Sequence, residues 1–134
     1  MKVHGSCHCG AIRLEADIDP GRVTVCHCTD CQQLTGTAFR LTVGCPERDF
    51  AIVAGEPRIY VKVADSGNRR LQAFCGDCGS NLYATSDEPP GNRIIGVRIG
   101  TLAERRDLPP ARQLWCDSAL PWLPGLPGEA RARE

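Results

Sequence analysis

The sequence predicts one mainly β domain with very little helix, formed by the whole chain, residues 1–134. Three observations predict this fold class. Apolar and β-branched residues alternate with polar ones in short runs, Gly and Pro turn signals recur about every ten residues, and helix-forming stretches are scarce. A chain of 134 residues can bury a core without covalent cross-links and suits a single domain.

The first expected strand covers residues 11–18, where Ile12 and Leu14 alternate with charged residues. A short helix is expected at 29–34, ended by Gly36, and a further helical turn at 102–106. The other expected strands are residues 23–25, 39–43, 50–53, 58–63, 71–74, 81–84 and 94–99, with turns at 44–46 and 55–57. The core is expected over about residues 5–125, and the tail, 126–134, is expected to be frayed.

The composition argues against several functional classes. The 16 basic residues balance the 16 acidic ones, so the chain lacks the positive excess that is typical of nucleic-acid binding. No apolar run approaches the roughly 18 residues that span a membrane, and the N-terminus has no apolar signal-like core. We therefore expect a cytoplasmic protein with no nucleic-acid or membrane partner, and the oligomeric state stays open.

The chain contains nine cysteines, and seven of them fall in three short clusters. Thiols two or three residues apart are poorly placed for disulfides with one another, whereas a metal ion needs several thiolates close together. The odd total and the lack of an export signal also favour metal over disulfides. The clusters are Cys7-His8-Cys9, Cys26-His27-Cys28-Thr29-Asp30-Cys31 and Cys75-Gly76-Asp77-Cys78.

Seven thiolates divide naturally into a closed zinc site with four ligands and an open site with three. The closed site would use Cys7, Cys9, Cys75 and Cys78, and the open site would use Cys26, Cys28 and Cys31. Cys45 remains open as a fourth ligand to the second group. Three thiolates and Zn²⁺ sum to a net charge of −1, which favours holding an incoming thiol as thiolate over generating hydroxide. We expect two zinc ions per chain, the second site being the more weakly occupied.

The cysteine clusters and their neighbours resemble a known family. The matching segments include Gly5-Ser6-Cys7-His8-Cys9-Gly10-Ala11, the second cysteine cluster with Thr35-Gly36-Thr37-Ala38-Phe39, and Phe74-Cys75-Gly76-Asp77-Cys78-Gly79-Ser80-Asn81-Leu82. Together with Gly100-Thr101-Leu102, Leu114-Trp115 and Pro121-Trp122-Leu123, they resemble the glutathione-dependent formaldehyde-activating enzyme (GFA) family over nearly the whole chain.

This resemblance implies an Mss4-like zinc-binding β-sheet fold and the same division of the cysteines into two zinc sites. In the named enzyme, glutathione and formaldehyde combine at the second zinc to give S-(hydroxymethyl)glutathione, which is a carbon–sulfur lyase reaction in reverse. The leading hypothesis is therefore an enzyme that joins a small thiol to a small aldehyde, with Cys26, Cys28 and Cys31 as the catalytic site.

Two other functions are considered beside it. One is a non-catalytic, zinc-stabilised binding module in which both zinc sites are structural, which Cys45 as a fourth ligand would favour. The other is thiol redox catalysis by Cys75 and Cys78, which is disfavoured because no βαβ pattern surrounds them.

Most of the remaining polar and aromatic residues are expected to have structural roles. His8 and His27 are expected to point away from the metal, because alternate side chains of an extended segment face opposite ways. Asp30 and Thr29 are expected to cap the short helix. The residues weighed for a substrate pocket are Phe39, as an apolar wall, and Arg40, Arg69 and Arg70, as solvated charges or as partners for the carboxylates of glutathione. Cys116 is expected to be a small buried side chain, Trp115 and Trp122 are expected to pack in the core or against the tail, and Cys45 is expected to lie in a loop.

Overall fold

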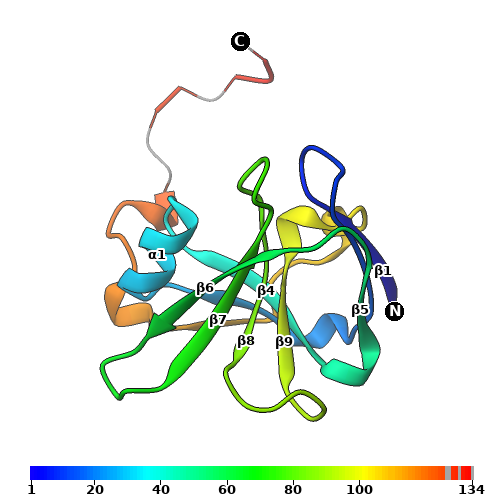
Figure 1. Cartoon of the computed structure of the whole chain (residues 1–134). Helices are drawn as coiled ribbons and strands as arrows, with labels where there is room; N and C mark the ends of the chain where they lie inside the picture. The colour runs from blue at the N-terminus through cyan, green and yellow to red at the C-terminus, as the bar shows by residue number, and fades with distance from the viewer. Residues whose placement is uncertain (126–127, 130, 134) are drawn as a thin grey trace.

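The computed structural model describes residues 1–125, 128, 129 and 131–133. Within this part of the chain, the strands form two sheets, and one short α-helix, α1 (Thr29–Thr35), stands beside several 3₁₀ turns (Figure 1). The mainly β fold with very little helix is therefore confirmed. The expected frayed tail, 126–134, includes residues that lie outside the described part.

The smaller sheet has three antiparallel strands in the order β1 (Lys2–Ser6), β2 (Arg13–Asp17) and β5 (Phe50–Ala54). In β1 and β2, alternate side chains are buried and exposed, which is the pattern of strands with one face on the core. The strand β1 was not identified from the sequence, because the run is short and its buried Gly5 carries no apolar side chain.

The larger sheet has seven strands, and only its β10–β3 pair is parallel. Figure 1 shows these strands fanning across the molecule, with α1 at one end and the smaller sheet at the other. In spatial order the strands are β10 (Arg112–Leu114), β3 (Val23–Cys26), β4 (Arg40–Pro46), β9 (Ile94–Arg98), β8 (Asn81–Ser86), β7 (Arg69–Phe74) and β6 (Arg58–Val63).

The core joins the two sheets. Apolar side chains from β1 and β2 pack with those from β3, β4, β8 and β9, and two of the metal-cluster cysteines belong to the same buried set. Its largest fully buried members are Leu14, Leu82, Ile95, Leu102 and Leu108. No helix in the described part of the chain is long and apolar enough to cross a membrane.

One expected turn is wrong. Residues 44–46 were expected to form a turn because of Gly44 and Pro46, yet β4 continues through them and pairs with β9 up to Ile94. Cys45 is therefore a strand residue in the core rather than a loop thiol. The expected helix is confirmed, since α1 ends at Gly36, whose φ of 67° is the left-handed conformation that favours glycine.

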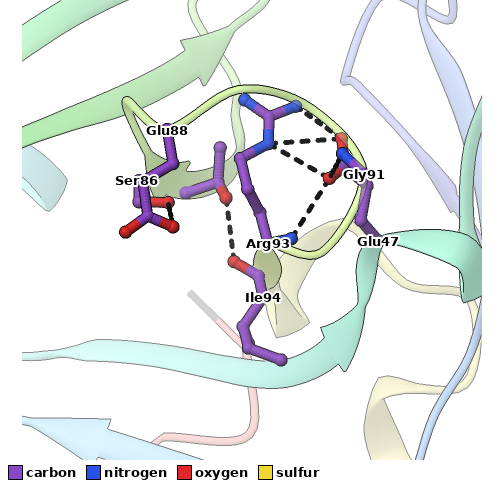
Figure 2. A network of polar contacts seen from close by, with 7 residues as sticks. Glu47, Ser86, Glu88, Gly91, Arg93 and Ile94 are labelled. Atoms are coloured by element: carbon purple, nitrogen blue, oxygen red, sulfur yellow. Dashed lines mark hydrogen bonds and ion pairs between the residues drawn. The ribbon is translucent and has the colours of Figure 1, made fainter.

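A carboxylate fastens the loop between β8 and β9 to the end of β4. Glu47 accepts hydrogen bonds from the backbone N–H of Gly91 (2.7 Å) and Arg93 (3.2 Å) and from the Arg93 guanidinium, as Figure 2 shows. These bonds lower the pKa of Glu47 from its ordinary 4.5 to about 2, the Arg93 side chain contributing most.

Replacing Glu47 with glutamine should lower the midpoint of thermal unfolding at pH 7. The folded-state pKa lies below the unfolded one, so the carboxylate's stabilisation is fully present above about pH 4.5 and is lost as the pH falls toward 2. The difference between wild type and Glu47→Gln should therefore shrink over that range, as followed by circular dichroism. The control is Glu88→Gln, because the Glu88 carboxylate accepts a bond from Ser86 at 3.3 Å and has no ion pair among the described residues. An equal pH dependence in the control would contradict the prediction.

Candidate metal centres

The first cysteine group is formed by two loops from different sheets. Cys7 and Cys9 lie after β1, and Cys75 and Cys78 lie between β7 and β8. Their four sulfur atoms all lie within 4.8 Å of one another. The backbone N–H of Ile12 donates to Cys7 Sγ at 3.2 Å, which fixes the first loop around its thiol. The structure thus brings these four predicted ligands together.

The spacing of these thiols fits a zinc ion. With Zn–S bonds of about 2.3 Å in a tetrahedron, neighbouring sulfurs stand about 3.8 Å apart. The Sγ atoms of Cys7 and Cys9 are 3.6 Å apart, and those of Cys9 and Cys75 are 3.8 Å apart. Hydrogen bonds from the Ser80 hydroxyl and from the backbone N–H groups of Cys9 and Ser80 lower the pKa of Cys78 to about 5. Four soft sulfur donors in a closed shell are the ligand set of a structural zinc site.

The second group is the tripod of Cys26, Cys28 and Cys31. Cys26 ends β3, Cys28 is the residue just before α1, and Cys31 lies in the first turn of that helix. Their sulfur atoms also lie within 4.8 Å of one another. Burial raises the pKa of Cys31 to about 12, and the hydrogen bond with Cys28 contributes to the same shift. The Cys31 thiolate is therefore unfavourable by itself, and a divalent cation bound by the tripod would stabilise it.

The helix cap differs from the expected one. The sulfur of Cys28 accepts the hydrogen bond from the backbone N–H of Cys31 at 3.3 Å, so Cys28 itself is the N-cap. Thr29 and Asp30 lie inside the helix, and Asp30 forms an ion pair with Lys62 of β6 (Nζ to Oδ2, 2.8 Å). The tripod thiol therefore takes over the role that a serine or aspartate usually fills.

Cys45 and the histidines stand outside both cysteine groups. Cys45 is 1% exposed and shares its face of β4 with Val43, whereas Cys26 is opposite Arg40 on the other face. Burial raises the pKa of Cys45 to about 11. His8 is exposed, whereas His27 is buried and its Nε2 lies 2.7 Å from the side-chain oxygen of Gln113.

A groove of about 440 Å³ opens beside the tripod at Cys28. Cys28 is partly exposed, while the other two tripod thiols are buried. The groove is lined by Cys28, Thr29, Asp30, Lys62, Ala64, Asp65, Ser66, Trp115 and Ser118. One tripod sulfur is thus accessible to a small molecule in the groove.

The expected burial of Cys116 is wrong, and the two tryptophans expected in the core or against the tail lie outside the core. Trp115 is 68% exposed, Trp122 is also exposed, and Cys116 is an exposed residue of a 3₁₀ turn. Gln32 holds this segment against α1 through a hydrogen bond to the carbonyl of Ser118 at 3.0 Å. Trp115 therefore forms a wall of the groove rather than part of the core.

Trp115 has a left-handed backbone conformation, with φ 57° and ψ 43°. Glycine adopts this conformation freely, whereas a side chain with a Cβ costs about 1–2 kcal/mol there. We expect Trp115→Gly to be more stable than Trp115→Ala by about 1 kcal/mol, although both lose the same aromatic ring. Denaturant unfolding of the two variants measures this difference, and the reverse order would contradict the left-handed conformation.

The arginines expected to be solvated have different surroundings. Arg69 is exposed and pairs with Asp87 at 2.7 Å. Arg40 and Arg70 are partly buried, and Arg98, which the sequence did not single out, is almost completely buried on the side of the sheet that carries Cys26. Phe39 lies partly buried beside the ring of His27, with centroids 6.0 Å apart.

Comparisons with known proteins agree with this arrangement. The profile of the family described as "Glutathione-dependent formaldehyde-activating enzyme" matches residues 2–118. A Schizosaccharomyces pombe protein named as an uncharacterized lyase is 29% identical over 79 residues, which cover 59% of this chain and 54% of that protein. The chain thus matches about half the length of this curated relative. A Rhodobacter sphaeroides protein of known crystal structure is alike in fold, with a TM-score of 0.62 at 22% identity over 84% of this chain and 99% of that one.

Proposed function

Because this chain belongs to the glutathione-dependent formaldehyde-activating enzyme family, we propose that it joins a small thiol to a small aldehyde at a zinc ion held by Cys26, Cys28 and Cys31. Glutathione and formaldehyde are the first pair to test, with S-(hydroxymethyl)glutathione as the product. The observation that carries the proposal is the tripod of three thiols, of which one faces an open groove. A zinc ion with three protein ligands keeps a position for an exchangeable fourth.

The chain's own residues define how the reactants approach. Cys26 and Cys31 are buried, so a substrate reaches the tripod from the side of Cys28. A zinc ion bound there would supply the positive charge that keeps the substrate thiol in its thiolate form at neutral pH. The sulfur then attacks the aldehyde carbon, and the carbon–sulfur bond forms as the carbonyl π bond breaks. The proton released by the thiol returns to the aldehyde oxygen through water.

Lys62 is the cation that lines the same groove. The Lys62 Nζ atom forms an ion pair with Oδ2 of Asp30 at 2.8 Å. Asp30 itself lies between the tripod residues Cys28 and Cys31 in the sequence. We propose that the Lys62 ammonium group stabilises the negative charge that develops on the aldehyde oxygen during attack, because a positioned ammonium group stabilises such charge.

We assign Cys7, Cys9, Cys75 and Cys78 to a second, structural zinc ion. The group cross-links the loop after β1, in the smaller sheet, to the loop between β7 and β8, in the larger one. Its role is to hold the two sheets together, so its loss is expected to affect folding before chemistry.

The experiment is the rate of S-(hydroxymethyl)glutathione formation, followed by proton NMR with zinc-loaded protein. A rate above that of the uncatalysed reaction supports the proposal. A rate unchanged by the protein, together with four protein ligands on both zinc ions by X-ray absorption, would instead favour a non-catalytic binding module.

A further inference from the structure

The strand β6 forms one edge of the larger sheet and, within the described part of the chain, pairs with β7 alone (Figure 1). Three of its six side chains are large, apolar or aromatic, and exposed: Ile59 (47%), Tyr60 (54%) and Val63 (60%). Proteins commonly protect such an edge with a free lysine, but Lys62 is bound to Asp30 of α1. The edge is therefore open to a further strand.

The hairpin between β6 and β7 shows which backbone groups of β6 face outward. The N–H of Ala64 donates to the carbonyl of Asn68 at 2.8 Å, so Ala64 is a hydrogen-bonded position of the ladder. Such positions alternate along an antiparallel strand, so Lys62 and Tyr60 also bond to β7, and the residues between them point their N–H and C=O groups away from it. These outward groups belong to Ile59, Val61 and Val63. They make no hydrogen bond within the described part of the chain.

The geometry of this edge suits a second copy of the same strand. Two identical antiparallel strands are related by a two-fold axis perpendicular to the sheet, so residues opposite each other share a face. Outward-facing residues must also meet outward-facing residues. A pairing centred on Val61 meets both conditions, with Val61 opposite its own counterpart and Ile59 opposite Val63 of the second copy. Apolar side chains then face one another along one face of the joined sheet.

Charge favours this register over the two nearest ones. With the centre at Val61, Lys62 is opposite Tyr60 of the second copy. A centre at Tyr60 would place Arg58 opposite Lys62, and a centre at Lys62 would place two lysines opposite each other. Like charges directly opposite one another destabilise a pair of strands.

The ends of the paired strands carry complementary charges. The register centred on Val61 places Arg58 of one copy opposite Ala64 of the other, beside Asp65. Neither Arg58 nor Asp65 has an ion pair within the described part of the chain. Ala64 and Asp65 also line the groove at the tripod, so the second copy would contribute Arg58 to the rim of that groove. The formal net charge of zero adds no long-range repulsion between copies.

We propose that the chain forms a symmetric dimer in which two β6 strands pair antiparallel about Val61. Each outward-facing pair exchanges two backbone hydrogen bonds, and the exposed apolar side chains of the edge cover one another. This inference goes beyond the proposed function and does not depend on it, because the interface involves neither thiol nor aldehyde. One pair of strands is a small interface, so we expect a dissociation constant on the order of 10 µM.

The test is sedimentation velocity of the zinc-loaded protein at about 1–300 µM, a range that brackets this constant. Ile59→Lys and Val63→Glu should each weaken dimerisation about tenfold, because each places a charge opposite an apolar side chain twice in the symmetric interface. Both side chains are exposed, so each variant should keep its fold. The double variant Ile59→Lys/Val63→Glu should recover most of the loss, because the two new charges meet across the two-fold axis.

Ile94→Lys is the matched control. Ile94 is exposed to nearly the same extent as Ile59, at 51%, but it belongs to β9 in the interior of the sheet. This variant should dimerise as the wild type does. A chain that stays monomeric at every concentration would overturn the proposal. A double variant that dimerises no better than the single variants would also overturn it, since another register or another surface would not bring residues 59 and 63 together. Neither outcome bears on adduct formation, so the proposed function stands or falls separately.

Discussion

Replacing Cys28 with serine should remove one of two zinc ions and reduce the formation of S-(hydroxymethyl)glutathione to the uncatalysed rate. Serine is not ionised at neutral pH, so the tripod keeps two thiolate ligands. We expect the zinc affinity of the tripod to fall by more than about 100-fold. Removing a residue that only hydrogen-bonds to a metal ligand costs up to about 100-fold, and the loss of a ligand should cost more. Zinc content per chain by elemental analysis and adduct formation by NMR measure the two effects.

The choice of serine keeps the fold nearly intact. The Cys28 sulfur accepts the capping hydrogen bond from the backbone N–H of Cys31, and a serine hydroxyl can accept the same bond. The change of capping group alone should therefore alter stability by less than about 1 kcal/mol, the usual value of a cap, apart from the stabilisation that a zinc ion bound to the tripod would add. Cys116→Ser is the control, since Cys116 is exposed and lies outside both cysteine groups. Two zinc ions and a full rate in Cys28→Ser would contradict the assignment of the tripod.

Replacing Cys75 with serine should have the largest effect on folding. Binding of a structural zinc ion is worth on the order of 10 kcal/mol, while the net stability of a domain is about 5–15 kcal/mol. Loss of one thiolate from the four-cysteine group should therefore leave much of the protein unfolded at room temperature. Circular dichroism and zinc content, with and without added zinc, measure this loss.

Cys45→Ser is the matched control for this experiment. Cys45 and Cys75 are buried to nearly the same extent, at 1% and 2% exposure, and both belong to the core. The same chemical change at Cys45 places a hydroxyl in the core without removing a proposed ligand, which costs about 1–3 kcal/mol. Equal losses of stability in the two variants would argue against metal at Cys75.

Local patterns were enough to predict much of the fold. Alternation identified β2 within residues 11–18, and Gly36 marked the end of α1 because the chain needs a left-handed residue there. The tripod also follows from local structure, since Cys28 and Cys31 are about one helical turn apart and Cys26 lies two residues before Cys28. In each case, the local conformation depends on residues that lie within a few positions of one another in the sequence.

The errors arose where neighbours in sequence do not set the environment. Gly44 and Pro46 suggested a turn, but β4 continues because β9 supplies hydrogen bonds on that side. Trp115 and Cys116 suggested packing by their apolar character, but the segment ends on the surface beside α1. Apolar character predicts average burial, and the position of a particular side chain depends on the elements that reach it.

The sequence by itself determined the mainly β class, the short helix and the clustering of thiols suited to metal, because each depends on residues within a few positions of one another. Only the tertiary structure decided what surrounds the tripod. Lys62 reaches Asp30 from β6, and Arg98 stands on the Cys26 face because of the register through β4. The physical reason is that a shift of one residue in strand pairing turns every side chain to the opposite face, and pairing between distant strands is set by the packing of the whole sheet.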